Sequence, residues 1–237
     1  MQSVWPDYRP VSWFCRTNLK GGGVAIYAKN DVKVYDINPD VDSVEQDEYC
    51  STKIKLNDKF FIILCLYRAP NGVFTNFRDK LIDLLEIVCS QCSCVFVAGD
   101  FNVNFNGNTG EACELLNIFS DFNVNFNGNT GEACELLNIF SSFGCQRLFD
   151  QDTRIANQSH SCIDNIFCND LSYVQSTDMN HFHVTDHLYQ LLTINTTFKN
   201  DKFRTLKRTF SEHAMSEFLS MISRETWNDV YCSDCYV

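Results

Sequence analysis

The chain has 237 residues, of which 45% are hydrophobic, and a formal net charge of −11. This length suits one domain of roughly 200 residues followed by a short tail. The acidic balance argues against a surface broadly covered with basic residues for nucleic acid, but it is compatible with a nuclease site that recruits a divalent cation. No apolar run approaches the ~20 residues of a membrane helix, and the N-terminal segment MQSVWPDYRP lacks the pattern of a secretory signal. We therefore expect an intracellular protein, nuclear or cytoplasmic, that is neither secreted nor bound to a membrane.

The first half of the chain alternates strand and helix patterns. A run of three glycines at 21–23 predicts a turn, and Asn30-Asp31 and Asn57-Asp58 suit turns between strands. Leucines at helical spacing follow the strand stop at Pro70. In chain order we expect strands at 24–29, 32–37, 49–56 and 59–68, an amphipathic helix at 73–90, and a buried strand at 94–99.

The second half continues the alternation. We expect a helix at 132–142, short strands near 146–149, 162–168, 171–177 and 190–195, and a helix that ends near 224. The last helix begins with a capping-box pattern at 209–212. Strands that alternate with helices predict an α/β fold.

Residues 100–120 and 121–141 are identical, so the chain holds a 21-residue tandem duplication. Two copies are too few for a solenoid, which indicates a duplication inside a domain that needs one copy. Only Asp100 follows an apolar strand, since Asp121 follows the end of a helix. Only the second helix leads directly into 142–150. We therefore expect Asp100 and Asn102 to serve the site, with the residues between them and 131 extruded.

Two features leave alternatives open. The 13 cysteines, without a secretory signal, predict reduced thiols, although Cys89-x-x-Cys92-x-Cys94 and Cys232-x-x-Cys235 could instead contribute to a zinc site. The basic segment 199–208 is either a solvated linker or a strip that contacts phosphate.

Four short motifs carry residues suited to phosphodiester chemistry. Such chemistry needs a cation, a base for water, a donor to the phosphate oxygens and a group that orients the base. A histidine next to an aspartate can act as a base near neutral pH, and arginine is a strong phosphate partner. The motifs place Tyr67 and Arg68 at a strand end, Asp100 and Asn102 at another, Asp164 within a strand, and Asp186 beside His187.

In this order the motifs resemble the endonuclease/exonuclease/phosphatase superfamily, which has the deoxyribonuclease-I-like fold. More narrowly they resemble the endonuclease of non-LTR (LINE-type) retrotransposons. The stretches that match are GGGVAIYAK (21–29), LCLYRAPNG (64–72), VFVAGDFNVNF (95–105), TRIANQSHSCIDNIF (153–167) and VTDHLYQLLTI (184–194). The segment 208–231 is similar to the one that leads from that endonuclease to a reverse transcriptase.

The resemblance implies a four-layer α/β sandwich, an activity on DNA that depends on Mg²⁺ (or Mn²⁺), and a role for each motif residue. Asp100 and Asn102 would act on water and phosphate, and Tyr67 would contact the phosphate. Asp164 would orient His187, while Asp186 would hold metal or position His187. Arg68, Arg154 and Ser161 would bind the substrate. No obligate protein partner is implied.

The chain departs from the family pattern at its front. The family begins with a strand that carries an asparagine and a strand followed by the glutamate that is the main metal ligand, and we expect neither of these strands before residue 21. We therefore expect an incomplete domain at 1–197, a linker and helix at 198–237, weakened metal binding that relies on Asp186, and an impaired nicking endonuclease. Two alternatives stay open: an inert remnant or binding module with the same fold, and a phosphatase of the same superfamily.

Overall fold

The computed structural model describes residues 6–16, 23–37, 47–106, 131–156, 159–181, 185–197 and 220. Backbone contacts divide the chain into two units, residues 1–198 and 199–237. The basic segment 199–208, the Cys232/Cys235 pair, Asp121 and all but one residue of the helix expected near 209–224 lie outside the described residues. The assignment of the tail as a linker to another domain remains a prediction.

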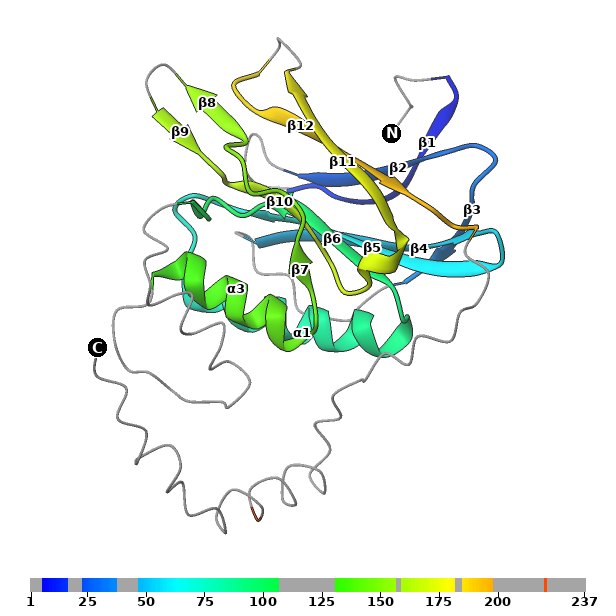
Figure 1. Cartoon of the computed structure of the whole chain (residues 1–237), viewed down its shortest axis with the longest axis horizontal. Coiled ribbons are helices and arrows are strands. Elements are labelled where there is room, and N and C mark those ends of the chain that lie inside the picture. Colours follow the sequence, from blue (N-terminus) through cyan, green and yellow to red (C-terminus); the bar gives the residue numbers. More distant parts are fainter. Residues whose placement is uncertain are drawn as a thin grey trace, which may run out of the picture. The chain divides into compact units, whose positions relative to one another are not determined.

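The first unit is built around one mixed sheet (Figure 1). Its six strands lie in the order β3-β4-β5-β6-β10-β7. The strands β5 and β6 run parallel, joined through α1, and every other neighbouring pair is antiparallel. The elements are β1 (Tyr8–Phe14), β2 (Val24–Lys29), β3 (Lys33–Asp36), β4 (Asp47–Leu56), β5 (Lys59–Arg68), α1 (Phe74–Gln91), β6 (Val95–Asp100), α3 (Glu132–Ser142), β7 (Gln146–Arg147), β8 (Arg154–Ala156), β9 (Ser159–Ser161), β10 (Asp164–Cys168), β11 (Val174–His181) and β12 (Leu188–Ile194).

Helices α1 and α3 cover one face of this sheet (Figure 1). The leucines of α1 that lie at helical spacing are buried, as the sequence pattern predicts, and pack with Ile62, Leu64 and Val97 of the sheet in the largest core cluster. The strand β5 is a nearly continuous apolar run because both of its faces are covered. None of the described helices is both long and apolar enough to cross a membrane.

Both copies of the duplication contribute phenylalanine side chains to this core. Phe101 and Phe105 come from the first copy and Phe140, in α3, comes from the second. The ring of Phe140 stacks on Phe167 with centroids 3.7 Å apart and meets the edge of Phe101 at 5.7 Å. The prediction that the second helix leads into the following strand is confirmed, since α3 is followed at once by β7.

The opposite face of the sheet is covered by two hairpins, β1–β2 and β11–β12 (Figure 1). Beneath β1–β2 lies a cluster with Val24, Ile26 and Cys50, and beside β11–β12 lies one with Phe61 and Phe96. Together with the helices these layers confirm the predicted α/β sandwich. Within the described part of the chain, each hairpin is a separate two-stranded sheet.

Four strands, β1, β8, β9 and β11, differ most from the sequence-based expectation. The strand β1 was not predicted, because Pro10 interrupts its apolar pattern; pairing with β2 holds it in place. The short hairpin β8–β9 was also missed, since three-residue strands carry too little pattern to detect. The strand expected from 171 begins only at Val174, because the Asp170 side chain accepts the Ser172 N–H and caps a single 3₁₀ turn at Leu171–Tyr173.

The cysteines near the end of α1 have separate partners. The thiol of Cys92 donates to the Phe60 carbonyl. The free thiols of Cys94 and Cys168 are hydrogen-bonded to each other, and so are those of Cys89 and Cys145. In the part of the chain that the structure describes, no cysteine belongs to a group that could hold a metal. The thiol interpretation therefore holds here, except that Cys134 is disulfide-bonded.

Replacing Gly144 by alanine should destabilise the fold by about 1 kcal/mol. Gly144 ends α3 with a φ of +72°, which L-residues adopt at a cost, although its surroundings leave room for a methyl group. Gly144→Asn is the matched control, because asparagine adopts this left-handed conformation more readily than alanine does, and urea unfolding should separate the two variants. Equal stabilities would contradict the argument from conformation.

Candidate active site

Four polar residues form a row across adjacent strand ends. Glu48 of β4 lies opposite Tyr67 of β5, Tyr67 is aligned with Asp100 of β6, and Asp100 lies opposite Asp164 of β10. Residues directly aligned on neighbouring strands share a face of the sheet. The row, called the polar row below, therefore gathers residues that are widely separated in sequence on the face opposite the helices.

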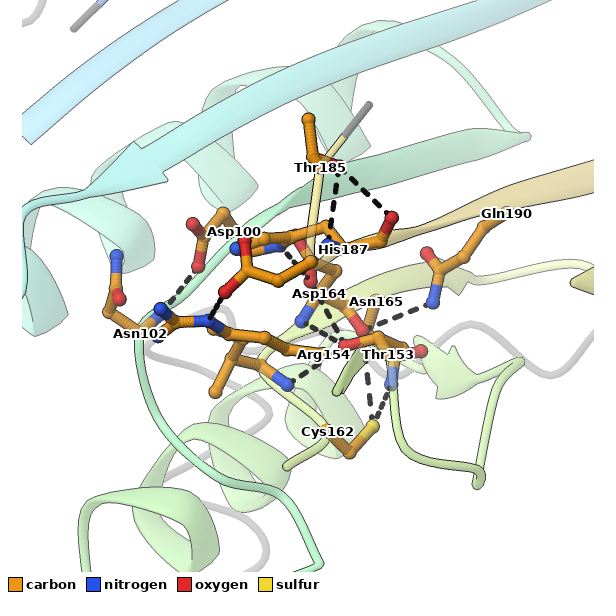
Figure 2. Close-up of polar contacts among 12 residues, drawn as sticks. Asp100, Asn102, Thr153, Arg154, Cys162, Asp164, Asn165, Thr185, His187 and Gln190 are labelled. Carbon is orange, nitrogen blue, oxygen red and sulfur yellow. Dashed lines mark hydrogen bonds and ion pairs between the residues drawn. The ribbon is translucent and has the colours of Figure 1, made fainter. Parts of the chain in front are cut away.

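The start of β12 adds an imidazole to the polar row (Figure 2). The Nδ1 of His187 lies 2.8 Å from Oδ2 of Asp164. The same carboxylate oxygen accepts the hydroxyl of Thr153 at 3.0 Å, and Gln190 donates to the Asp164 backbone carbonyl. Asp164 is thus fixed from several sides, and it holds the ring of His187 so that Nε2 remains for chemistry.

Thr153 was not predicted as part of the site. It is fully buried, and its hydroxyl oxygen accepts the backbone N–H groups of Ile163 and Asp164 at 3.1 and 3.0 Å. Its backbone carbonyl accepts the N–H of Leu188 at 2.7 Å, which ties β12 to this loop. A threonine carries no local signal for such a role, because all its partners come from other segments.

Asp100 is half-buried, and the pKa of its carboxyl is raised. Burial raises the pKa of Asp100 to about 6, and the nearby Asp164 charge adds to this rise. The Asn102 N–H, which donates to Asp100 Oδ1 at 3.0 Å, and the charges of His187 and Arg154 act in the opposite direction. Two carboxyls so close together leave negative charge that a cation would relieve.

Within the described ranges, Asp100, Asp164 and His187 form a cluster that could hold a metal. One ligand atom from each lies within 4.8 Å of the others. The carboxylates suit a hard divalent cation such as Mg²⁺ or Mn²⁺, which keeps waters at its other positions. The uncompensated charge around Asp100 is consistent with such an ion, so the residues present fit a hydrated cation.

Asp186, the residue expected to hold metal, takes a different position. Its carboxylate is 2.7 Å from Nε of Arg154, and this guanidinium lowers the pKa of Asp186. The carboxylate that contacts the His187 ring at Nδ1 is that of Asp164 (Figure 2). Because its charge is already paired, Asp186 serves here to hold Arg154 beside the polar row.

Arg154 and Ser161 face each other across the β8–β9 hairpin, where their Cα atoms are partners. The side chain of Arg154 is 43% exposed. The backbone of this hairpin is joined to the His187 segment, since Ile155 N–H donates to the Asp186 carbonyl at 2.9 Å. Two of the three residues expected to bind substrate thus lie together at the Asp164 end of the polar row.

Asn102 and Arg68 form the turn that supports Asp100. Asn102 has a φ of +47°, and its Nδ2 donates to the Arg68 carbonyl at 2.7 Å. The Arg68 side chain is 5% exposed, and it donates to the Asn102 and Gly72 carbonyls on the helix side of the sheet. Consecutive strand residues point to opposite faces, so Tyr67 reaches the polar row and Arg68 does not. The structure therefore gives Arg68 a place in holding the turn, in contrast to the expected contact with substrate.

Gly99 allows β6 to approach β5 closely just before Asp100. A Cβ at Gly99 would lie 2.3 Å from the Leu66 carbonyl oxygen, a backbone atom that cannot move aside. The close packing of β6 on β5 thus requires glycine at this position of the Gly-Asp-x-Asn motif. The same register aligns Asp100 with Tyr67.

No protein-family model and no curated protein sequence matches this chain. Solved structures do match it. The endonuclease domain of TRAS1, a telomere-specific non-LTR retrotransposon, is 14% identical over 82% of this chain and 83% of that one, with a TM-score of 0.58. The AP endonuclease LMAP from Leishmania major is 12% identical over 80% and 71% of the two chains, with a TM-score of 0.57.

A third match is an endonuclease/exonuclease/phosphatase family protein from Leptotrichia buccalis, 15% identical over 80% of this chain and 72% of that chain, with a TM-score of 0.51. Identities this low establish the fold and not the activity. With its mixed sheet, helices on one face and hairpins on the other, the chain has the deoxyribonuclease-I-like α/β fold that these endonuclease/exonuclease/phosphatase proteins share.

Proposed function

We propose that this chain is a divalent-metal-dependent hydrolase of DNA phosphodiesters, a nicking endonuclease of reduced activity. The observation that carries the proposal is the joining of the Asp164–His187 pair to Asp100 in one cluster on the polar row. The resemblance of the motifs to retrotransposon endonucleases supports DNA as the substrate. The fold similarity to an endonuclease domain from such an element is consistent with this.

Each site residue is assigned a role in phosphodiester hydrolysis. His187, held through Nδ1 by Asp164, offers Nε2 to take or give a proton. Asp100 orients the attacking water by accepting its hydrogen bond, while the second amide hydrogen of Asn102 and the phenol of Tyr67 donate to phosphate oxygens. A bound divalent cation supplies neutralisation of the charge that develops on the phosphate. Arg154 adds a fixed positive charge at the Asp164 end.

Reduced activity follows from the small number of ligands. Asp100, Asp164 and His187 are the only group in the described part of the chain that could hold a metal, and it includes one imidazole and no glutamate. Because the Nδ1 of His187 is already bonded to Asp164, the cation relies mainly on two carboxylates. We therefore expect weak binding of Mg²⁺. The same observation favours the second candidate, an inert protein that retains the fold.

Plasmid nicking in Mg²⁺ tests the proposal. Supercoiled DNA should be converted slowly to the open circle, and His187→Gln should slow this at least tenfold because the proton-transferring group is lost. His160→Gln is the matched control, since His160 is exposed on β9 and its nearest acidic partner is Asp152 at 3.8 Å. Nicking that persists unchanged in His187→Gln would contradict the proposed role.

Calorimetry with Mg²⁺ separates the two candidates. Binding heat accompanied by nicking identifies the enzyme. A cooperatively melting protein that neither binds Mg²⁺ nor nicks DNA identifies the inert alternative.

A further inference from the structure

A second arginine lies at the other end of the polar row, outside any motif. Arg16 follows β1, and its guanidinium carbon lies 5.7 Å from the centre of the Tyr67 ring. Its Nε is paired with Glu48, the first member of the polar row. Glu48 also accepts the backbone N–H of Gly23, at the start of β2. These contacts fix Arg16 above Tyr67 through groups that all belong to the β1–β2 hairpin or to β4.

The Arg16–Glu48 pair is unusual for a purely structural ion pair. The Glu48 side chain is fully buried and that of Arg16 is 15% exposed. Burial of two charges costs free energy that is regained only when the remaining donors also find partners. Among the described residues, Nε and Nη2 of Arg16 and Oε1 of Glu48 are buried without a hydrogen-bond partner, although Nε and Oε1 form the ion pair. The guanidinium is thus incompletely satisfied by Glu48, and the oxygens of a phosphate match the geometry of its fork and would supply the missing acceptors.

Arg16 lies where it could contact a DNA backbone that runs across the strands of the sheet. Neighbouring strands are about 4.8 Å apart, so Tyr67 lies about one strand spacing from Asp100 along the polar row. Arg154 lies at the opposite end, close enough for its charge to affect Asp100. Two arginines therefore bracket the pair of carboxyls. Because successive charges on one DNA strand are separated by about 3.4 Å along the helix axis, a strand laid along the polar row presents several phosphates to it.

We propose that Arg16, positioned by Glu48, binds the DNA phosphate next to the reacting one on the Tyr67 side. The inference rests on the proposed function, because it takes DNA as the substrate. It adds a binding residue and a direction for the substrate strand, which runs across the strands of the sheet from Arg16 to Arg154. Glu48 is then a positioning residue that does not touch DNA.

DNA binding by the full chain tests this inference without relying on turnover. The binding of a labelled DNA duplex is measured by fluorescence anisotropy in Mg²⁺ at several salt concentrations, on a His187→Ala background that spares the DNA. The test variant is Arg16→Met/Glu48→Gln, which removes both charges together and so avoids leaving Glu48 buried alone. The control is Arg78→Met/Glu135→Gln, which removes an ion pair of 3.0 Å between α1 and α3, on the helix side of the sheet.

The test variant should bind DNA roughly three- to tenfold more weakly, and the slope of log K against log salt should become shallower by about 0.9. The control should match the background in both respects. Arg16→Lys should retain most of the slope, since it keeps the charge but loses the fork. Thermal melting of each variant shows that the fold is intact.

Two results would overturn the inference. If test and control variants bind with equal affinity and slope, Arg16 does not contact phosphate, while the proposed function stands. If the His187→Ala protein itself shows no salt-dependent DNA binding, the inference falls together with the DNA substrate of the proposed function.

Discussion

Asp100→Asn should stabilise the metal-free protein near neutral pH while abolishing its response to Mg²⁺. The pKa of Asp100 is raised from its ordinary value of 3.8 to about 6, mainly by burial. The folded state therefore binds this proton more tightly than the unfolded chain does. The contribution of Asp100 to stability is lost as pH rises from about 4 to about 6, and it stays lost above that range.

A rise of this size corresponds to at most about 3 kcal/mol, and partial exposure of the carboxyl reduces it, so we expect a gain of roughly 1–2 kcal/mol for Asp100→Asn. The amide can still accept the Asn102 N–H, so the turn is preserved. The measurement is urea unfolding in EDTA from about pH 4 to 8. The difference between variant and wild type should shrink as pH falls below about 6 and vanish near pH 4.

Asp186→Asn is the control for this experiment, because Asp186 is an exposed neighbour whose pKa is lowered by Arg154. Its replacement should not stabilise the protein. In Mg²⁺ the wild type should gain stability, since the ion binds only the folded state, and Asp100→Asn should not. Nicking should fall on the order of a hundredfold or more in Asp100→Asn. Equal pH profiles for wild type and Asp100→Asn would falsify the assigned burial of this charge.

Thr153→Val should destabilise the fold by about 2–4 kcal/mol and also reduce nicking. The two side chains have nearly the same shape, so the loss is that of the hydroxyl. Two buried N–H groups, those of Ile163 and Asp164, lose their acceptor. Asp164 also loses a donor to the oxygen that faces His187, which loosens the pair that is proposed to move the proton.

Thr153→Ser supplies the matched comparison, because it keeps the hydroxyl and loses only a methyl group. It should cost about 1 kcal/mol and leave nicking near the wild-type rate. Chemical denaturation and plasmid nicking measured on both variants separate a lost hydrogen-bond hub from a lost methyl group. If Thr153→Ser is as damaging as Thr153→Val, packing and not hydrogen bonding explains the effect.

Much of the fold could be predicted because it depends on patterns within short segments. The apolar run of 59–68 and the leucine stripe of α1 each identify one element, since burial imposes the period of the side chains. The same patterns failed for β1 and β8–β9. These strands exist because a neighbouring strand supplies their hydrogen bonds, which no local pattern records.

The duplication shows the limit of local patterns most directly. Identical sequences have identical propensities, so composition alone cannot select a copy. The choice of Asp100 and of the second helix rested on what flanks each copy. Among the described residues, Asp100 ends β6 and the second copy forms the helix Glu132–Ser142, with Phe101 of one copy packed against Phe140 of the other; residues 107–130, with the rest of the first copy and Asp121, lie outside the described part.

Local patterns in the sequence identified Tyr67, Asp100, Asn102, Asp164 and His187 as candidates for phosphodiester chemistry and placed the first three near strand ends. The partners of these residues became visible in the folded chain. It paired His187 with Asp164, assigned Asp186 to Arg154, turned Arg68 away from the polar row and brought in Thr153, Glu48 and Arg16. The physical reason is that side-chain direction and strand register depend on hydrogen bonds between distant segments, whereas strand and turn propensities depend on neighbours in the chain.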